Sequence, residues 1–100
     1  MEYVYMIKCG DGSLYTGWTN DIEKRFAAHC AGKGAKYTRG RGPLRLAHLE
    51  IFEDRTEAQR REAQIKKLTR AAKLMLVSEG SGRQAELIIH KVNIAGSGQK

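Results

Sequence analysis

The first 18 residues constrain the fold most, because they contain two strand-forming runs on either side of a turn. Residues 2–8 (EYVYMIK) and 13–18 (SLYTGW) are rich in aromatic and β-branched side chains, which favour extended backbone. Between them, residues 9–12 (CGDG) supply glycines that tolerate the positive φ values of tight turns. The sequence therefore predicts a β-hairpin over residues 2–18.

A helix is expected directly after the hairpin. Asn20 can cap its free amides, and Glu23, three residues later, completes a capping box. Gly32 is a natural end for this helix. The spacing of Arg25 and His29 places these two side chains on one helix face, apart from the apolar residues.

The rest of the chain predicts one more strand and two more helices. Residues 32–43 form a glycine-rich basic loop, and residues 44–52 alternate as a strand does. Asp54 and Thr69 are in position to cap helices over residues 55–68 and 70–79, the second ended by Gly80. We therefore expect a small single α+β domain, with a three-stranded antiparallel sheet flanked by helices in the order strand, strand, helix, strand, helix, helix.

The domain itself is expected to cover residues 1–80. Residues 81–100 are expected to be a C-terminal tail, partly flexible, because residues 85–94 have apolar character but the end is rich in glycine and serine. The sequence has no apolar run near the length of a membrane span and no signal-peptide pattern, so we expect a cytoplasmic protein.

The charge balance favours a polyanionic partner. Eighteen Lys and Arg against 11 Asp and Glu give a net charge of +7, and basic surfaces bind nucleic acid because they release condensed counterions. A basic surface that only keeps the chain in solution is the plainer alternative. Cys9 and Cys30 lack zinc-ligand spacing and are expected to be reduced thiols, with a site shared with His29 and His48 as the weaker alternative.

Five side chains are candidates for chemistry, although each has a plainer explanation alone. Tyr5 and Tyr15 lie at roughly facing positions of the hairpin, where tyrosines commonly serve packing. Arg25 and His29 on an amphipathic helix are commonly solvated. Glu62, among basic neighbours, is equally suited to weak ion pairs on a helix surface.

Their order along the chain resembles the GIY-YIG nuclease superfamily. Residues 3–5 (YVY) stand where that family has its first motif and residues 15–17 (YTG) where it has the second. Arg25 matches the family's helix arginine and Glu62 its metal-binding glutamate. His29, with the segment 34–43, is similar to the branch of structure-selective resolvases, and the whole is similar to small stand-alone bacterial YhbQ-like proteins. The resemblance covers about residues 2–78.

The resemblance implies a mechanism for hydrolysing phosphodiester bonds. Glu62 would hold one Mg²⁺ (or Mn²⁺), which keeps most of its waters when it has a single carboxylate ligand. Arg25 would bind the phosphate, and Tyr15 would be the general base for the attacking water. His29 is an alternative base or a relay for the proton of Tyr15, and Tyr5 would orient water or phosphate.

Substrate binding is expected from the basic loop and its aromatic neighbours. Basic side chains that track phosphates, beside aromatic rings that stack on bases, suit single-stranded or branched DNA in repair or recombination, and RNA equally. Either the substrate is broad, such as single strands or flaps, or a protein partner supplies the targeting. The expected nucleic-acid-binding residues are Gly17, Trp18, Lys33, Lys36, Tyr37, Thr38, Arg39 and Arg41, with Arg45 in addition.

Two other functions stay open at this point. Trp18 stands where some family members have a lysine, and Leu74 stands at about the place of a late asparagine. A binding module that kept the fold and lost the reaction is therefore one alternative. The other is an interaction domain whose basic face meets an acidic protein.

Overall fold

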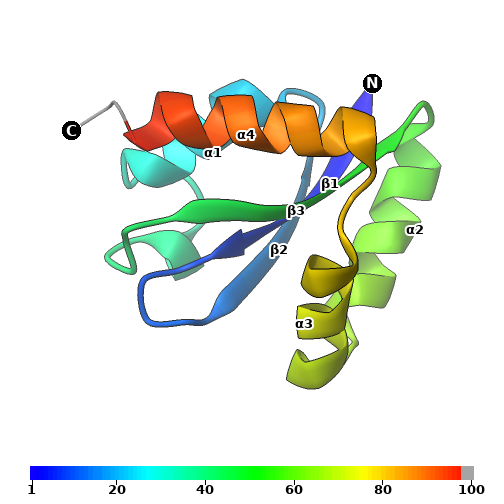
Figure 1. Ribbon diagram of the computed structural model, residues 1–100, viewed down its shortest axis with the longest axis horizontal. Helices are drawn as coiled ribbons and strands as arrows, with labels where there is room; N and C mark the ends of the chain where they lie inside the picture. Colours follow the sequence, from blue (N-terminus) through cyan, green and yellow to red (C-terminus); the bar gives the residue numbers. More distant parts are fainter. Residues whose placement is uncertain (98–100) are drawn as a thin grey trace.

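A computed structural model describes residues 1–97 and shows a three-stranded antiparallel sheet in the order β2-β1-β3 with helices on both faces (Figure 1). This confirms the predicted α+β class. The elements are β1 (Glu2–Lys8), β2 (Leu14–Thr19), α1 (Ile22–Cys30), a short 3₁₀ turn (Lys36–Thr38), β3 (Arg45–Phe52), α2 (Arg55–Lys66), α3 (Arg70–Glu79) and α4 (Arg83–Ser97).

The central strand β1 divides the core into two parts because its side chains alternate between the two faces of the sheet. Tyr5 and Ile7 pack on one face with residues of α1 and α4. Val4 and Met6 pack on the other face with residues of α2 and α3. All four side chains of β1 are buried, so this strand is enclosed on both sides.

Helix caps are formed largely where the sequence predicts them, with one correction. Asp54 and Thr69 accept the backbone N–H groups that the caps of α2 and α3 require. At α1 the cap is Asp21, whose carboxylate accepts from the N–H of Lys24, and not Asn20. The hydroxyl of Thr19 accepts the N–H of Asp21 at 3.1 Å and fixes the turn one residue later than the capping-box pattern indicates.

The C-terminal segment differs from the tail that the sequence predicts. Residues 83–97 form α4, which packs across the sheet beside α1 (Figure 1). Ala85, Ile89 and Val92 are buried in the same core as Tyr5, so residues 83–97 belong to the domain. The expected flexibility concerned the chain end, and residues 98–100 lie outside the described residues.

The outer edge of β3 is covered by side chains from the last part of the chain. The amide of Asn93 accepts from the N–H of Leu46 at 2.7 Å and donates to the carbonyl of Leu46 at 2.9 Å. Ser81 accepts the N–H of Leu49 at 3.1 Å. These contacts satisfy backbone groups that an edge strand otherwise leaves open to pairing with other chains.

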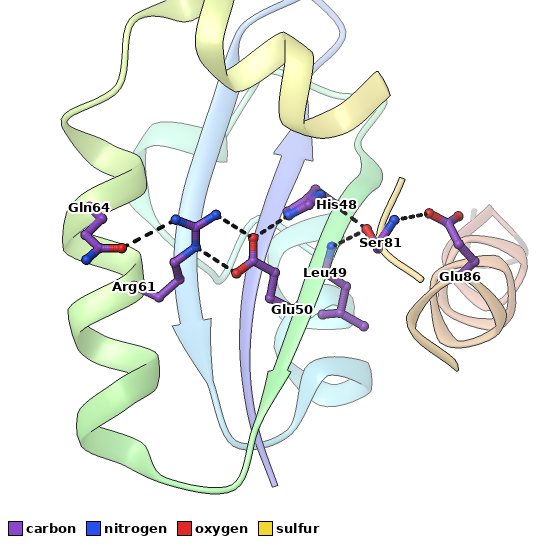
Figure 2. A network of polar contacts seen from close by, with 7 residues as sticks. All are labelled: His48, Leu49, Glu50, Arg61, Gln64, Ser81 and Glu86. Atoms are coloured by element: carbon purple, nitrogen blue, oxygen red, sulfur yellow. Dashed lines mark hydrogen bonds and ion pairs between the residues drawn. The ribbon is translucent and has the colours of Figure 1, made fainter. Parts of the chain in front are cut away.

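A polar network ties β3 to α2 and to the linker before α4 (Figure 2). Glu50 accepts two hydrogen bonds from Arg61, at 2.7 and 3.1 Å, and one contact of 2.8 Å joins it to His48. Burial alone would raise the pKa of Glu50, but the bonds from His48 and Arg61 outweigh it and lower the pKa to about 2. On the other side, His48 lies 3.2 Å from the hydroxyl of Ser81.

None of the helices within residues 1–97 combines the length and the apolar character needed to cross a membrane.

Candidate active site

The candidate active site is formed around Tyr5, whose position follows from the register of the hairpin. β1 pairs with β2 so that Tyr5 faces Gly17, whereas Tyr15 faces Ile7. The two tyrosines, expected at roughly facing positions, are therefore offset by two residues along the paired strands. A methyl group on Gly17 would lie 2.5 Å from the phenol oxygen of Tyr5, so only glycine leaves room for this ring.

His29 forms the next layer of the site and is 1% exposed. It belongs to the buried face of α1 with Ile22 and Phe26, which corrects its predicted place with Arg25 on a face apart from the apolar residues. Its Nε2 lies 2.9 Å from the phenol oxygen of Tyr5.

The other ring nitrogen of His29 fixes the direction of the hydrogen bonds. Nδ1 lies 2.8 Å from the hydroxyl of Thr38, which in turn donates to the carbonyl of Ala35 at 3.0 Å. Because a hydroxyl has one proton, Thr38 must accept from Nδ1–H, and Nε2 is then free to accept from Tyr5. The N–H of Ala35 lies 3.4 Å from Nδ1, which is beyond the usual range of a competing bond.

These hydrogen bonds also require the backbone at Gly34 to approach the ring of His29 closely. A methyl group on Gly34 would overlap Nδ1 of His29. Thr38 is 2% exposed, so its predicted contact with nucleic acid is corrected: its hydroxyl holds the histidine instead. Gly17 likewise makes space for Tyr5 beneath the site.

The electrostatics of the site keep Tyr5 and His29 neutral. Burial raises the pKa of Tyr5 to about 12, against a hydrogen bond from Arg25 that lowers it. Burial and then the charge of Arg25 lower the pKa of His29 to about 4. The guanidinium of Arg25 interacts with both Tyr5 and Tyr15, and these contacts raise its pKa.

Solvent reaches Tyr15, which is partly exposed, whereas Tyr5 and His29 are buried. Its ring centroid lies 6.3 Å from that of Tyr5 and 5.3 Å from that of His29. Both nitrogens of His29 already have partners, Tyr5 and Thr38. His29 is therefore placed to position Tyr5, and the predicted direct relay from Tyr15 has no free nitrogen to use.

Tyr37 covers the outer side of Tyr15. The two rings are stacked, with centroids 5.8 Å apart and an interplanar angle of 28°. The guanidinium of Arg41 lies 4.4 Å from the centroid of the Tyr37 ring and also pairs with Asp11 at the hairpin turn. The ring of Tyr37 therefore contacts both Tyr15 and Arg41, which limits the predicted stacking of Tyr37 on bases.

Asp11 is a supporting residue that the sequence did not reveal. Hydrogen bonds from Ser13, and then the pairing with Arg41, lower its pKa to about 2, so it stays ionised. Its salt bridge fastens the basic loop to the hairpin turn. In the sequence, Asp11 in residues 9–12 carried only a turn signal, and no local pattern points to a partner 30 residues away.

Glu62 lies on α2 and is close enough for its charge to raise the pKa of Tyr5. Its carboxylate is partly exposed and lies 3.2 Å from Nζ of Lys66. Within residues 1–97 no group of three or more His, Cys, Asp or Glu side chains is arranged to hold a metal. A lone, partly exposed carboxylate fits Mg²⁺, which needs few protein ligands.

The remaining predicted residues are spread over the surface. Trp18 lies on the opposite face of the sheet, in the core with α2, where the guanidinium of Arg55 lies 5.4 Å from its ring. It is therefore not placed to bind nucleic acid together with Tyr37. The exposed basic residues of the loop and of the start of β3 are Lys33, Lys36, Arg39 and Arg45.

The cysteines do not form a metal site. Cys9 is buried and Cys30 exposed, and both are free thiols, as the sequence predicts. His29 and His48 are bonded to Tyr5 and Thr38 in one case and to Glu50 and Ser81 in the other. The weaker alternative of a shared zinc site is therefore not supported within residues 1–97.

Comparison with known proteins gives close relatives. UPF0213 protein CPE1444 of Clostridium perfringens is 63% identical over 81 residues, which are 81% of this chain and 87% of the relative. UPF0213 protein SSP2268 of Staphylococcus saprophyticus is 53% identical over 79 residues, 79% of this chain and 96% of the relative. The solution NMR structure of UPF0213 protein BH0048 of Bacillus halodurans superimposes with a TM-score of 0.55 at 49% identity, covering 85% of this chain and 92% of that one.

A family model gives the broader relationship. Residues 1–75 match the model described as the GIY-YIG catalytic domain, which is a domain of nucleases. The match includes Tyr5, Tyr15, Arg25, His29 and Glu62. The chain belongs to the GIY-YIG catalytic domain family.

Proposed function

We propose that this protein is a Mg²⁺- or Mn²⁺-dependent endonuclease that hydrolyses phosphodiester bonds in DNA. The observation that carries the proposal is the meeting of Tyr15, Arg25 and the buried Tyr5–His29 pair, with Glu62 in electrostatic range of Tyr5. Family membership supports a nuclease. The substrate and the metal rest on the chemistry of these side chains.

Tyr15 acts as the general base. Of Tyr5 and Tyr15 it is the partly exposed one, and it interacts with the guanidinium of Arg25. The phenolate takes a proton from the water that attacks phosphorus, and the bond from phosphorus to the 3′ oxygen breaks. Arg25 presents a permanently charged, planar fork to the non-bridging phosphate oxygens as negative charge increases on them.

Tyr5 and His29 position the other groups. The hydroxyl of Tyr5 donates to His29 and receives a hydrogen bond from Arg25, so the guanidinium is held from below. Thr38 and the carbonyl of Ala35 hold the histidine in turn. A preorganised set of this kind aligns phosphate and water without reorganisation during the reaction.

Glu62 is the residue that would hold the divalent cation. A cation bound there supplies Lewis-acid stabilisation of the charge on the phosphate and on the departing oxygen. Lys66, 3.2 Å from Glu62, must then turn away from the carboxylate, and its exposed position allows this.

The basic loop of residues 32–43 binds the substrate. Lys33, Lys36 and Arg39 are exposed and suited to phosphates, without any base-reading helix. Single-stranded or branched DNA, in repair or recombination, is the substrate class that fits. We further propose a cytoplasmic location and a protein partner that directs the enzyme to its target.

A cleavage assay tests this function. Labelled single-stranded, duplex, flap and four-way-junction DNA, and an RNA strand, are incubated with Mg²⁺, with Mn²⁺ or with EDTA. We expect cleavage with either metal, none with EDTA, and none by Glu62→Gln. The matched control Glu53→Gln, an exposed glutamate just before α2, retains activity.

Two results would contradict the proposal. Intact binding with no cleavage of any substrate under either metal favours the binding module that has lost the reaction. Cleavage that persists in EDTA, or equally in Glu62→Gln, removes the metal from the mechanism.

A further inference from the structure

A groove lies beside the site, between the hairpin and the start of α3. Its volume is about 190 Å³. It borders Tyr15 in two ways, because Leu14 precedes Tyr15 in β2 and Tyr37 stacks on the ring of Tyr15. The lining residues are Ser13, Leu14, Tyr37, Arg70 and Lys73.

The groove carries positive charge that no carboxylate neutralises. Arg70 and Lys73 make no ion pair with any residue in the described part of the chain, and the lining includes no acid. Arg41 and Lys66 differ in this respect, because each pairs with a carboxylate, Arg41 with Asp11 and Lys66 with Glu62. Two unpaired cations in one concave surface attract a phosphate group.

Arg70 is held in place before any ligand arrives. One terminal nitrogen of its guanidinium donates to the carbonyl of Gly12 at 2.8 Å, across the groove from α3 to the hairpin. The remaining N–H groups of the fork stay available for an anion. Lys73 follows three residues later, so it lies on the same face of α3, and its side chain is partly buried.

The size and chemistry of the groove select the ligand class. Pockets for drug-sized molecules measure about 300–1,000 Å³, so this groove suits a smaller group such as a phosphate with its sugar. Tyr37 already contacts Tyr15 and Arg41, so a base has little access to the faces of its ring. Contacts to phosphate alone read no base sequence.

We propose that Arg70 and Lys73 bind a backbone phosphate of the substrate strand adjacent to the phosphate that is cleaved. This rests on the proposed nuclease function and deepens it, because the substrate must then extend past the cleavage point toward α3. The site is additional to the basic loop of residues 32–43, and it binds without regard to sequence.

The test measures binding separately from cleavage. The affinity for a fluorescein-labelled single-stranded oligothymidylate is followed by anisotropy in EDTA over a series of salt concentrations. Each phosphate contact contributes about 0.7 to the slope of log K against log salt on single strands. The double variant Arg70→Gln/Lys73→Gln should therefore lower the slope by about 1.4, and Lys73→Gln alone by about 0.7.

A double variant on α4 is the matched control. Arg83→Gln/Lys91→Gln also removes two positive charges, but from exposed positions of α4. Helix α4 and helix α3 pack on opposite faces of the sheet. The slope of this control should equal that of the parent. Lys73→Gln loses no hydrogen bond seen in residues 1–97, so it reports on the groove even if Arg70→Gln loosens the hairpin.

The possible outcomes separate this site from the reaction. A reduced slope in the groove variants alone supports the site, even if the parent cleaves nothing and the nuclease function fails. Equal slopes in the groove variants and the α4 control overturn the site, and the cleavage assay still decides the nuclease function independently.

Discussion

The phenol oxygen of Tyr5 lies 2.9 Å from Nε2 of His29, so a buried hydrogen bond joins the central strand to a helix 24 residues further along the chain. Both side chains are 1% exposed. Their bond continues through Thr38 to the carbonyl of Ala35, so the hydroxyl of Tyr5, both ring nitrogens of His29 and the hydroxyl of Thr38 all have partners. The site is thus built on a rigid base, above which Tyr15 and Arg25 meet the solvent.

Replacing Gly17 with alanine should displace that base. The added methyl group would lie 2.5 Å from the phenol oxygen of Tyr5, which is closer than atoms can approach. A displacement of about 1 Å in a catalytic array can reduce the rate about 100-fold, and we expect a loss of that order in DNA cleavage. Gly42→Ala, whose methyl group meets nothing nearer than 4.0 Å, is the control. Equal rates in the two variants would contradict the role of Tyr5.

Replacing Thr38 with valine should disturb His29 while keeping the shape of the side chain. The variant leaves Nδ1–H and the carbonyl of Ala35 without their partner, at a cost of about 1–3 kcal/mol in the free energy of unfolding. Chemical denaturation measures that loss, and cleavage should fall with it. Thr38→Ser keeps the hydroxyl and should restore both. A serine variant as impaired as the valine variant would show that packing, not the hydrogen bond, matters.

Stability should decrease as the pH falls from 7 to 5, because of His29. The pKa of His29 is lowered to about 4 in the folded protein, against 6.5 in an unfolded chain. Below pH 6.5 the unfolded state therefore binds a proton that the folded state does not, and the free energy of unfolding falls until about pH 4. The part of this loss between pH 7 and 5 is about 2 kcal/mol.

Urea denaturation at several pH values measures this effect. Glu50 and Asp11 have pKa values of about 2 in the folded protein and ordinary values near 4, so their titration changes the free energy of unfolding at lower pH. In His29→Gln the free energy of unfolding should change less between pH 7 and 5 than in the parent. In His90→Gln, on α4, it should change as much as in the parent. A change in His29→Gln as large as in the parent would contradict the assignment.

The polar network of β3 should contribute to stability. Glu50→Gln removes the charge that faces Arg61 and His48 in a partly buried setting, where breaking an ion pair is costly. We expect the free energy of unfolding to fall by about 2 kcal/mol, which is below the range for fully buried pairs. Glu23→Gln removes an exposed pair with Lys91 and should change stability by less than about 0.5 kcal/mol.

The sequence predicts the local features of this protein better than the long-range ones. The strands, the first three helices and the caps at Asp54 and Thr69 follow from alternation, spacing and capping, which are local properties. The sequence places the residues of α4 in a partly flexible tail because the chain end, residues 96–100, is rich in glycine and serine, although residues 85–94 have apolar character. The helical structure of α4 depends on burying Ile89 and Val92 against the sheet, and that contact is not visible in the segment itself.

The same distinction holds within the site. The order of Tyr5, Tyr15, Arg25, His29 and Glu62 along the chain identified the residues that could meet, and the structure brings the first four together with Glu62 in range. Their individual partners depend on register and loop path. One residue of offset in the hairpin pairing decides which side chain faces which, and Asp11 finds Arg41 only because the loop of residues 32–43 folds back.

The most direct test of the account is the single-turnover cleavage rate of Tyr15→Phe, with Mg²⁺ and the best substrate of the panel. Tyr3→Phe is the control, since Tyr3 is a partly buried packing residue of the same hairpin. Loss of the general base should reduce the rate about 100-fold or more while DNA binding is retained, and Tyr3→Phe should cleave at the parent rate. Full activity in Tyr15→Phe would contradict the proposed mechanism.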